Sequence, residues 1–240
     1  MSRRPYRIQL YWQGRSTPRP RLAEELWQCV GSLPWASPRL ARLQPYSQEG
    51  ELLPPITSAA HAESLLAHWT VRWRTGAVER TAYKAPFVLD SLDDSKFRFE
   101  LTTGIEPLGF DGVWVPNRLE VLVDPEAPDG LASRDVLLAI LHVGARVFDP
   151  DWGFAALDGE PVPPTPLFSS GDPMAAWMTY LSKRFPLADL AVAEPSAVYS
   201  VGELGYLVIA YPEPPRPGSA RQGAALEAVT AAFRAAQIVR

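Results

Sequence analysis

Alternating apolar and polar residues predict three strands that each have one apolar face. In residues 6–12 the apolar side chains fall on every second position, and the same period recurs in residues 97–101 and 119–123. A period of two is typical of a half-buried strand. Strands with one polar face favour an antiparallel or mixed sheet with helices on one side, because parallel sheets covered on both faces lose the alternation.

Helical spacing and shorter apolar runs complete the predicted set of elements. Apolar residues three or four positions apart predict long helices over 18–33, 58–76, 133–148 and 220–236, and short ones over 38–43 and 173–181. Further strands are predicted over 153–157, 197–201 and 206–211. Strands and helices do not alternate regularly. The pattern therefore predicts an α+β fold, with a mixed or largely antiparallel sheet of five to six strands and about five helices packed on it.

The domain organisation is predicted to be simple. The chain has no internal repeat, and 25 prolines among its 240 residues indicate long, stiff connections. Residues 161–173, with five prolines, form the best candidate boundary. The segment that follows is short for a separate hydrophobic core. We expect one domain over residues 1–240.

Composition indicates a folded protein of the cytoplasm. Apolar residues make up 47% of the chain and aromatic residues 10%, which is ordinary for a globular protein. No stretch approaches the roughly 18 to 20 apolar residues that span a bilayer, and the N-terminus lacks the apolar core of a secretory signal. The single cysteine, Cys29, excludes an intrachain disulfide and is expected to be a small apolar filler.

The charge distribution is uneven. Residues 1–48 hold eight Arg and two Glu, whereas residues 85–160 hold fifteen acidic and five basic side chains, although the whole chain has a net charge of only −4. We call residues 85–160 the acidic segment. A field of that sign repels nucleic acid and attracts a basic protein surface. We therefore expect no direct contact with DNA or RNA.

Residues that support catalysis are scarce. His61 and His68 lie seven positions apart on one predicted helix, too far for the i, i+4 pair of helical zinc sites. His142 lies in the predicted central helix, where a buried neutral histidine is expected. The chain has no glycine-rich phosphate loop and no nucleophile motif. The expectation is a protein that is not an enzyme and that carries no metal and no cofactor.

One pair of carboxylates supports an alternative. Asp149 and Asp151 can supply oxygen ligands to Mg²⁺, so a metal-dependent hydrolase that uses Asp149 and Asp151 stays open as a second interpretation. Pro150 between them, and the Trp-Gly pair that follows, are also typical of a structured turn. In a turn, the carboxylates would accept hydrogen bonds from nearby backbone amides.

Five short motifs occur in a fixed order along the chain. They are Tyr11-Trp12-Gln13-Gly14-Arg15, Leu101-Thr102-Thr103-Gly104, Asp149-Pro150-Asp151-Trp152-Gly153, Trp177-Met178-Thr179-Tyr180-Leu181 and Gly202-x-x-Gly205. In this order they resemble the landmarks of the immunity protein 52 family of bacterial polymorphic-toxin and type VI secretion systems. One departure from the pattern is Ala176, because the family commonly has glycine before the Trp-Met pair.

The resemblance implies a non-enzymatic immunity protein. Such a protein binds a cognate toxin by protein-protein contact and neutralises it, and the toxin is typically a restriction-endonuclease-like DNase. An adaptor or chaperone for a secreted effector is the other alternative. The resemblance brings no catalytic residues. We assign its motif residues a structural role: Trp12, Gly14, Arg15, Asp149, Asp151, Trp152, Gly153, Trp177 and Tyr180.

Candidate toxin-binding residues come from the acidic segment. The candidates are Asp90, Asp93, Asp94, Asp111 and Asp129, and all five lie outside the predicted strands and helices. Loop carboxylates are expected to be exposed and to steer a basic partner. Two aromatic residues in a glycine-rich connection, Phe110 and Trp114, are the candidate apolar anchors that slow dissociation.

Overall fold

The computed structural model describes residues 4–13, 17–75, 78–89, 96–104, 117–158, 173–185, 187 and 190–238. Ten strands form one sheet in which every neighbouring pair is antiparallel. The strands are β1 (Tyr6–Trp12), β2 (Leu43–Pro45), β3 (Thr70–Thr75), β4 (Val78–Leu89), β5 (Phe97–Thr103), β6 (Asn117–Val123), β7 (Trp152–Leu157), β8 (Met178–Ser182), β9 (Ala197–Ser200) and β10 (Gly205–Ile209). Their order is β2-β4-β5-β6-β1-β7-β8-β10-β9, and β3 also pairs with β4.

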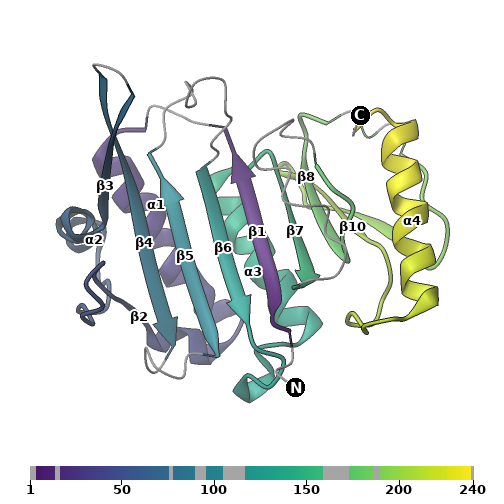
Figure 1. The fold of residues 1–240 in the computed structure, drawn as a ribbon, viewed down its shortest axis with the longest axis horizontal. Helices are drawn as coiled ribbons and strands as arrows, with labels where there is room; N and C mark the ends of the chain where they lie inside the picture. The colour runs from purple at the N-terminus through teal and green to yellow at the C-terminus, as the bar shows by residue number, and fades with distance from the viewer. Residues whose placement is uncertain are drawn as a thin grey trace.

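Four α-helices accompany the sheet in the described residues. They are α1 (Arg19–Ser32), α2 (Ala59–Leu65), α3 (Arg134–Phe148) and α4 (Ala220–Ala235). Short 3₁₀ helices span η1 (Leu33–Trp35), η2 (Pro38–Arg42), η3 (Leu66–Trp69) and η4 (Pro128–Gly130). In Figure 1, α1 and α3 lie behind the central strands, and α4 lies at the β10 end of the sheet. The opposite face of the sheet, which is turned toward the viewer in Figure 1, carries no described helix over β5, β6 and β1.

The core lies between the central strands and α3. Trp12 at the end of β1 stacks on Phe148 of α3, with ring centroids 5.1 Å apart. Gly144 lets the helix pack close to the sheet, because a Cβ there would lie 2.2 Å from Leu10 Cδ1. Ile8 and Leu10 are fully buried. Burying side chains of this size contributes about 1.5–3 kcal/mol each to the free energy of folding, relative to exposure. Strand β1 therefore lies in the middle of the sheet and also contributes to the stability of the core.

Most of the strongly periodic predictions are confirmed. The structure is α+β, and strands occur at 6–12, 97–103, 117–123, 152–157, 197–200 and 205–209. Helices α1, α3 and α4 also lie where they are predicted, and Ser133 caps α3 by accepting a hydrogen bond from Val136 N. The predicted count of five to six strands is too low, because the sheet has ten.

One predicted helix is too long, and another is wrong. The helix predicted over 58–76 ends at Leu65, and the chain then turns through η3 into strand β3. The short helix predicted over 173–181 is a loop followed by β8. All five residues of β8 are buried, so side chains on both faces of the strand are covered. A strand buried on both faces has no polar alternation, so its period is hidden.

Strand β4 is missing from the sequence prediction because Pro86 interrupts it. Proline lacks a backbone N–H and is rare in the middle of a sheet. Here Pro86 O accepts a hydrogen bond from Tyr46 N at 3.2 Å, on the edge away from β5. The nitrogen and oxygen of one strand residue point to the same edge, so the missing N–H removes no bond between β4 and β5.

The possible domain boundary falls in a part of the chain that the structure does not describe. Residues 161–172 of the possible boundary lie outside the described residues, so the single domain stays a prediction. The strands on either side of that stretch, β7 and β8, are neighbours in the sheet. Among the described helices, none combines the length and apolarity that crossing a bilayer requires.

Candidate interaction surfaces

The Asp149–Gly153 turn joins the end of α3 to the end of β1. Asp149 adopts a left-handed conformation with φ of 42°, and its N–H donates to Ala145 O at 3.1 Å, which ends the helix. Asp151 N donates to Tyr11 O at 2.8 Å. Asp151 Oδ2 accepts from Gln13 N, also at 2.8 Å. The turn therefore uses its backbone and a carboxylate to fix two elements that are far apart in sequence.

Both carboxylates of the turn also bind one arginine. Arg184, just after β8, places Nη2 2.7 Å from Asp149 Oδ2 and donates from Nη1 to Asp151 Oδ1. A metal ion between the two carboxylates would have to displace this guanidinium group. No cluster of three or more His, Cys, Asp or Glu that could hold a metal is found among the described residues. The geometry is that of a structural clamp.

We expect Arg184→Gln to lower the free energy of unfolding by about 1 kcal/mol. The guanidinium group joins two carboxylates, but its side chain is 51% exposed, and exposed ion pairs contribute little each. Urea denaturation at low and high salt measures the change, and the difference from the parent should shrink in high salt. A loss above about 3 kcal/mol would contradict this view of the clamp.

The aromatic motif residues lie in the core. Trp12, Trp152 and Trp177 are 4%, 2% and 0% exposed. Tyr180 is also buried, and its hydroxyl donates to Leu204 O at 2.9 Å. Burial, followed by the nearby charge of Asp149, raises the pKa of Tyr180 to about 12. These side chains hold strands together and offer no surface to a partner. Gly14 and Arg15 of the first motif lie outside the described residues.

The structure places only one of the candidate toxin-binding residues. Asp90, Asp93, Asp94, Asp111, Phe110 and Trp114 lie outside the described residues. Asp129 is described, and its side chain is 58% exposed. Asp129 Oδ2 lies 2.6 Å from Arg39 Nη1. The carboxylate is therefore accessible but already paired with a cation, which reduces the negative charge that it presents to a partner.

Other carboxylates of the acidic segment are paired on the sheet face without helices. Glu120 lies 3.5 Å from Arg7, and Asp158 lies 3.1 Å from the same guanidinium group. Glu100 lies 3.2 Å from Lys84 Nζ. Both cations come from outside the acidic segment. The charge difference counted along the sequence is therefore partly neutralised by the fold.

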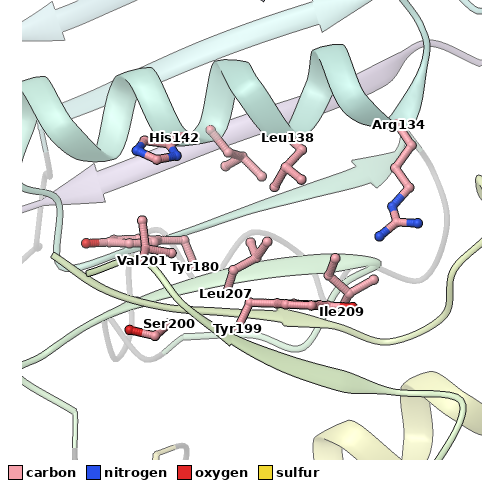
Figure 2. A pocket seen from close by; sticks show the side chains of 10 residues that line it. Arg134, Leu138, His142, Tyr180, Tyr199, Ser200, Val201, Leu207 and Ile209 are labelled. Atoms are coloured by element: carbon pink, nitrogen blue, oxygen red, sulfur yellow. The ribbon is translucent and has the colours of Figure 1, made fainter. Parts of the chain in front are cut away.

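A cavity of about 280 Å³ separates α3 from the last strands of the sheet (Figure 2). Its walls are mostly apolar and come from α3, β8, β9 and β10. Leu138 and His142 lie one turn apart on the helix and point toward Leu207 and Tyr199 (Figure 2). The sequence pattern does not reveal this site, because its walls come from separate segments that only the strand order brings together.

Two polar side chains of the cavity are His142 and Arg134. His142 is exposed and lines the cavity, so its prediction as a buried histidine is wrong; it lies on the face of α3 that is turned from the core. Arg134, at the start of α3, has a buried Nε with no hydrogen-bond partner among the described residues.

Cys29 lies in the core, away from these surfaces. It is fully buried, and burial raises the pKa of its thiol far above the usual value, as expected for a small apolar filler.

These features define an α+β protein built on one wide antiparallel sheet. No protein-family model matches the chain, and no curated protein matches it in sequence. Among solved structures, the fold is similar to that of the Pseudomonas aeruginosa T6SS (type VI secretion system) protein PA0821, with a TM-score of 0.61 and 16% sequence identity. The match covers 96% of this chain and 72% of that chain. At this identity the similarity shows a shared fold.

Proposed function

We propose that the protein is a non-enzymatic immunity protein that binds and neutralises a cognate bacterial toxin. The observation that carries the proposal is the fold shared with a type VI secretion protein over 96% of the chain. The ordered motifs that resemble the immunity protein 52 family support it independently. The partner that this resemblance implies is a restriction-endonuclease-like DNase, held by protein-protein contact.

The hydrolase alternative receives no support from the described residues. Asp149 and Asp151 share the guanidinium group of Arg184, and Asp151 also accepts a backbone hydrogen bond from Gln13. These contacts give both carboxylates a role in the fold. The adaptor alternative involves the same kind of contact with an effector protein, so only an assay of neutralisation separates it from immunity.

Co-expression with the toxin-domain protein of the neighbouring gene tests the proposal. We expect restored growth, a stoichiometric complex on size exclusion, and loss of DNase activity in the purified complex. A nuclease-inactive toxin variant serves as the control for growth. A stable complex without rescue of growth would favour the adaptor. If neither rescue nor a complex is seen, the proposed function is wrong.

A further inference from the structure

Strand β9 forms an exposed edge of the sheet. Within the described part of the chain it pairs with β10 alone. Its sequence, Ala-Val-Tyr-Ser, contains no charged residue and no proline. Val198 is 37% exposed and Tyr199 is 50% exposed. Natural proteins usually protect such edges with lysine, proline or a bulge, because an open edge accepts a strand from another chain.

The direction of the backbone groups shows which residues of β9 can pair with an added strand. Val201 N donates to Gly205 O at 2.8 Å, so its backbone groups face the β10 side. Along an antiparallel strand these groups alternate between the two edges. Tyr199 therefore also bonds toward β10, whereas Val198 and Ser200 direct their N–H and C=O groups to the open edge. Two residues of β9 can each offer one donor and one acceptor to an added strand.

The cavity beside α3 lies next to this edge. Tyr199 and Val201 line it from the β9 side, and Leu207 lines it from β10 (Figure 2). Arg134 lies at one end of the cavity, and His142 lies eight residues further along α3 (Figure 2). At a rise of 1.5 Å per helical residue, the cavity extends about 12 Å along α3, which is the length of three or four extended residues.

We propose that the open edge of β9 and the adjacent cavity bind an extended segment of the toxin. The segment adds to β9 as a further strand, places an apolar side chain between Leu138 and Leu207, and sets a carboxylate on Arg134. Backbone pairing supplies affinity in this mode of recognition, and the pocket supplies specificity. The inference rests on the proposed function, and it uses other residues than the candidate aspartates of the acidic segment.

Charge complementarity favours a different chain over a second copy of this one. A copy paired through its own β9 would bring Ala197–Ser200 to the edge, and this strand has no carboxylate for Arg134. Arg134 is the one arginine or lysine among the residues that line the cavity, and its buried Nε has no hydrogen-bond partner in the described residues. Arginine is also one of the residue types that are enriched at the energetic hot spots of protein interfaces.

Three variants of the full-length protein test the inference by calorimetry with the toxin of the neighbouring gene. Val198→Pro removes an N–H at the open edge and leaves the ladder to β10 intact, and Val198→Ala is its control. Arg134→Gln removes the guanidinium charge at the cavity, and Arg146→Gln removes an exposed charge elsewhere on α3. Leu138→Trp fills the cavity. We expect each test variant to weaken binding at least about tenfold, and each control to change it less than about threefold.

The outcomes separate the inference from the proposed function. If the parent rescues growth and binds the toxin while all three folded variants bind equally well, the inference is wrong and the immunity role stands. If the parent neither rescues nor binds, both fail.

Light scattering of the parent alone provides a further test. A dimer that Val198→Pro converts to monomer would mean that β9 pairs with a second copy, which also overturns the proposal. Ser200→Pro replaces Val198→Pro if the latter does not fold.

Discussion

Replacing Trp152 by alanine is expected to lower the free energy of unfolding by about 3–5 kcal/mol. The indole is 2% exposed and packs against Tyr11, with ring centroids 4.7 Å apart, and against Phe154 at 6.2 Å. Truncation leaves a cavity on the β1–β7 pair, where the sheet cannot close around it. Urea denaturation followed by circular dichroism measures the loss. Protection against the toxin should fall only as far as the folded fraction falls.

The phenylalanine variant gives a more discriminating comparison. Trp152 Nε1 is buried and has no hydrogen-bond partner among the described residues, whereas Trp177 Nε1 donates to Tyr211 O at 3.0 Å. Removing an unpaired buried donor relieves a cost, whereas removing a paired donor loses a buried hydrogen bond. Trp177→Phe should therefore destabilise the protein by about 1–3 kcal/mol more than Trp152→Phe.

The outcome that would contradict the core role concerns the alanine variant. If Trp152→Ala is as stable as the parent and no longer protects, Trp152 is an interface residue and its core role is wrong.

Strands β5 and β6 are predictable from the sequence because one face of each is partly exposed. In β5, Phe97 and Phe99 are buried while Arg98 between them is exposed, so the pattern of residues reports the pattern of burial. In β8, every position is buried and the pattern disappears. Strand β4 contains Pro86, whose missing N–H would face the edge away from β5, so it does not interrupt the pairing of β4 with β5. Local periodicity therefore predicts half-buried strands. Of the two described strands that are fully buried, β7 is predicted as a short apolar run and β8 is not.

The charge pattern shows the same limit. Counting residues 85–160 predicts a strongly acidic surface, but Arg7, Arg39 and Arg184 pair with carboxylates of that segment across long separations in sequence. These cations stand outside the counted window, so the sum along the chain overstates the negative field. The turn at Asp149 is predictable because its residues are contiguous. The cavity beside β9 is not, because residues 134–142 and 199–209 meet only in the folded sheet.

Gly205→Ala is expected to be the other strongly damaging substitution, with a loss of about 3–5 kcal/mol. Gly205 begins β10 with φ of 155°, a conformation that side-chain-bearing residues rarely adopt. A Cβ at this position would lie 2.2 Å from Leu181 O and 2.9 Å from Ser182 Cα. Both contacts are to the backbone of β8, which cannot move without breaking its pairing with β7 and β10. The cost therefore falls on the sheet itself.

Gly202→Ala is the matched control, three residues away in the same turn. Gly202 also has a positive φ, of 59°, but no heavy atom lies within 4 Å of the position that a Cβ would occupy. Its substitution carries the conformational cost alone, which is about 1 kcal/mol. The difference between the two variants in urea denaturation isolates the overlap with β8. Equal losses would mean that β8 yields to the added methyl group, and that Gly205 is required only for its backbone conformation.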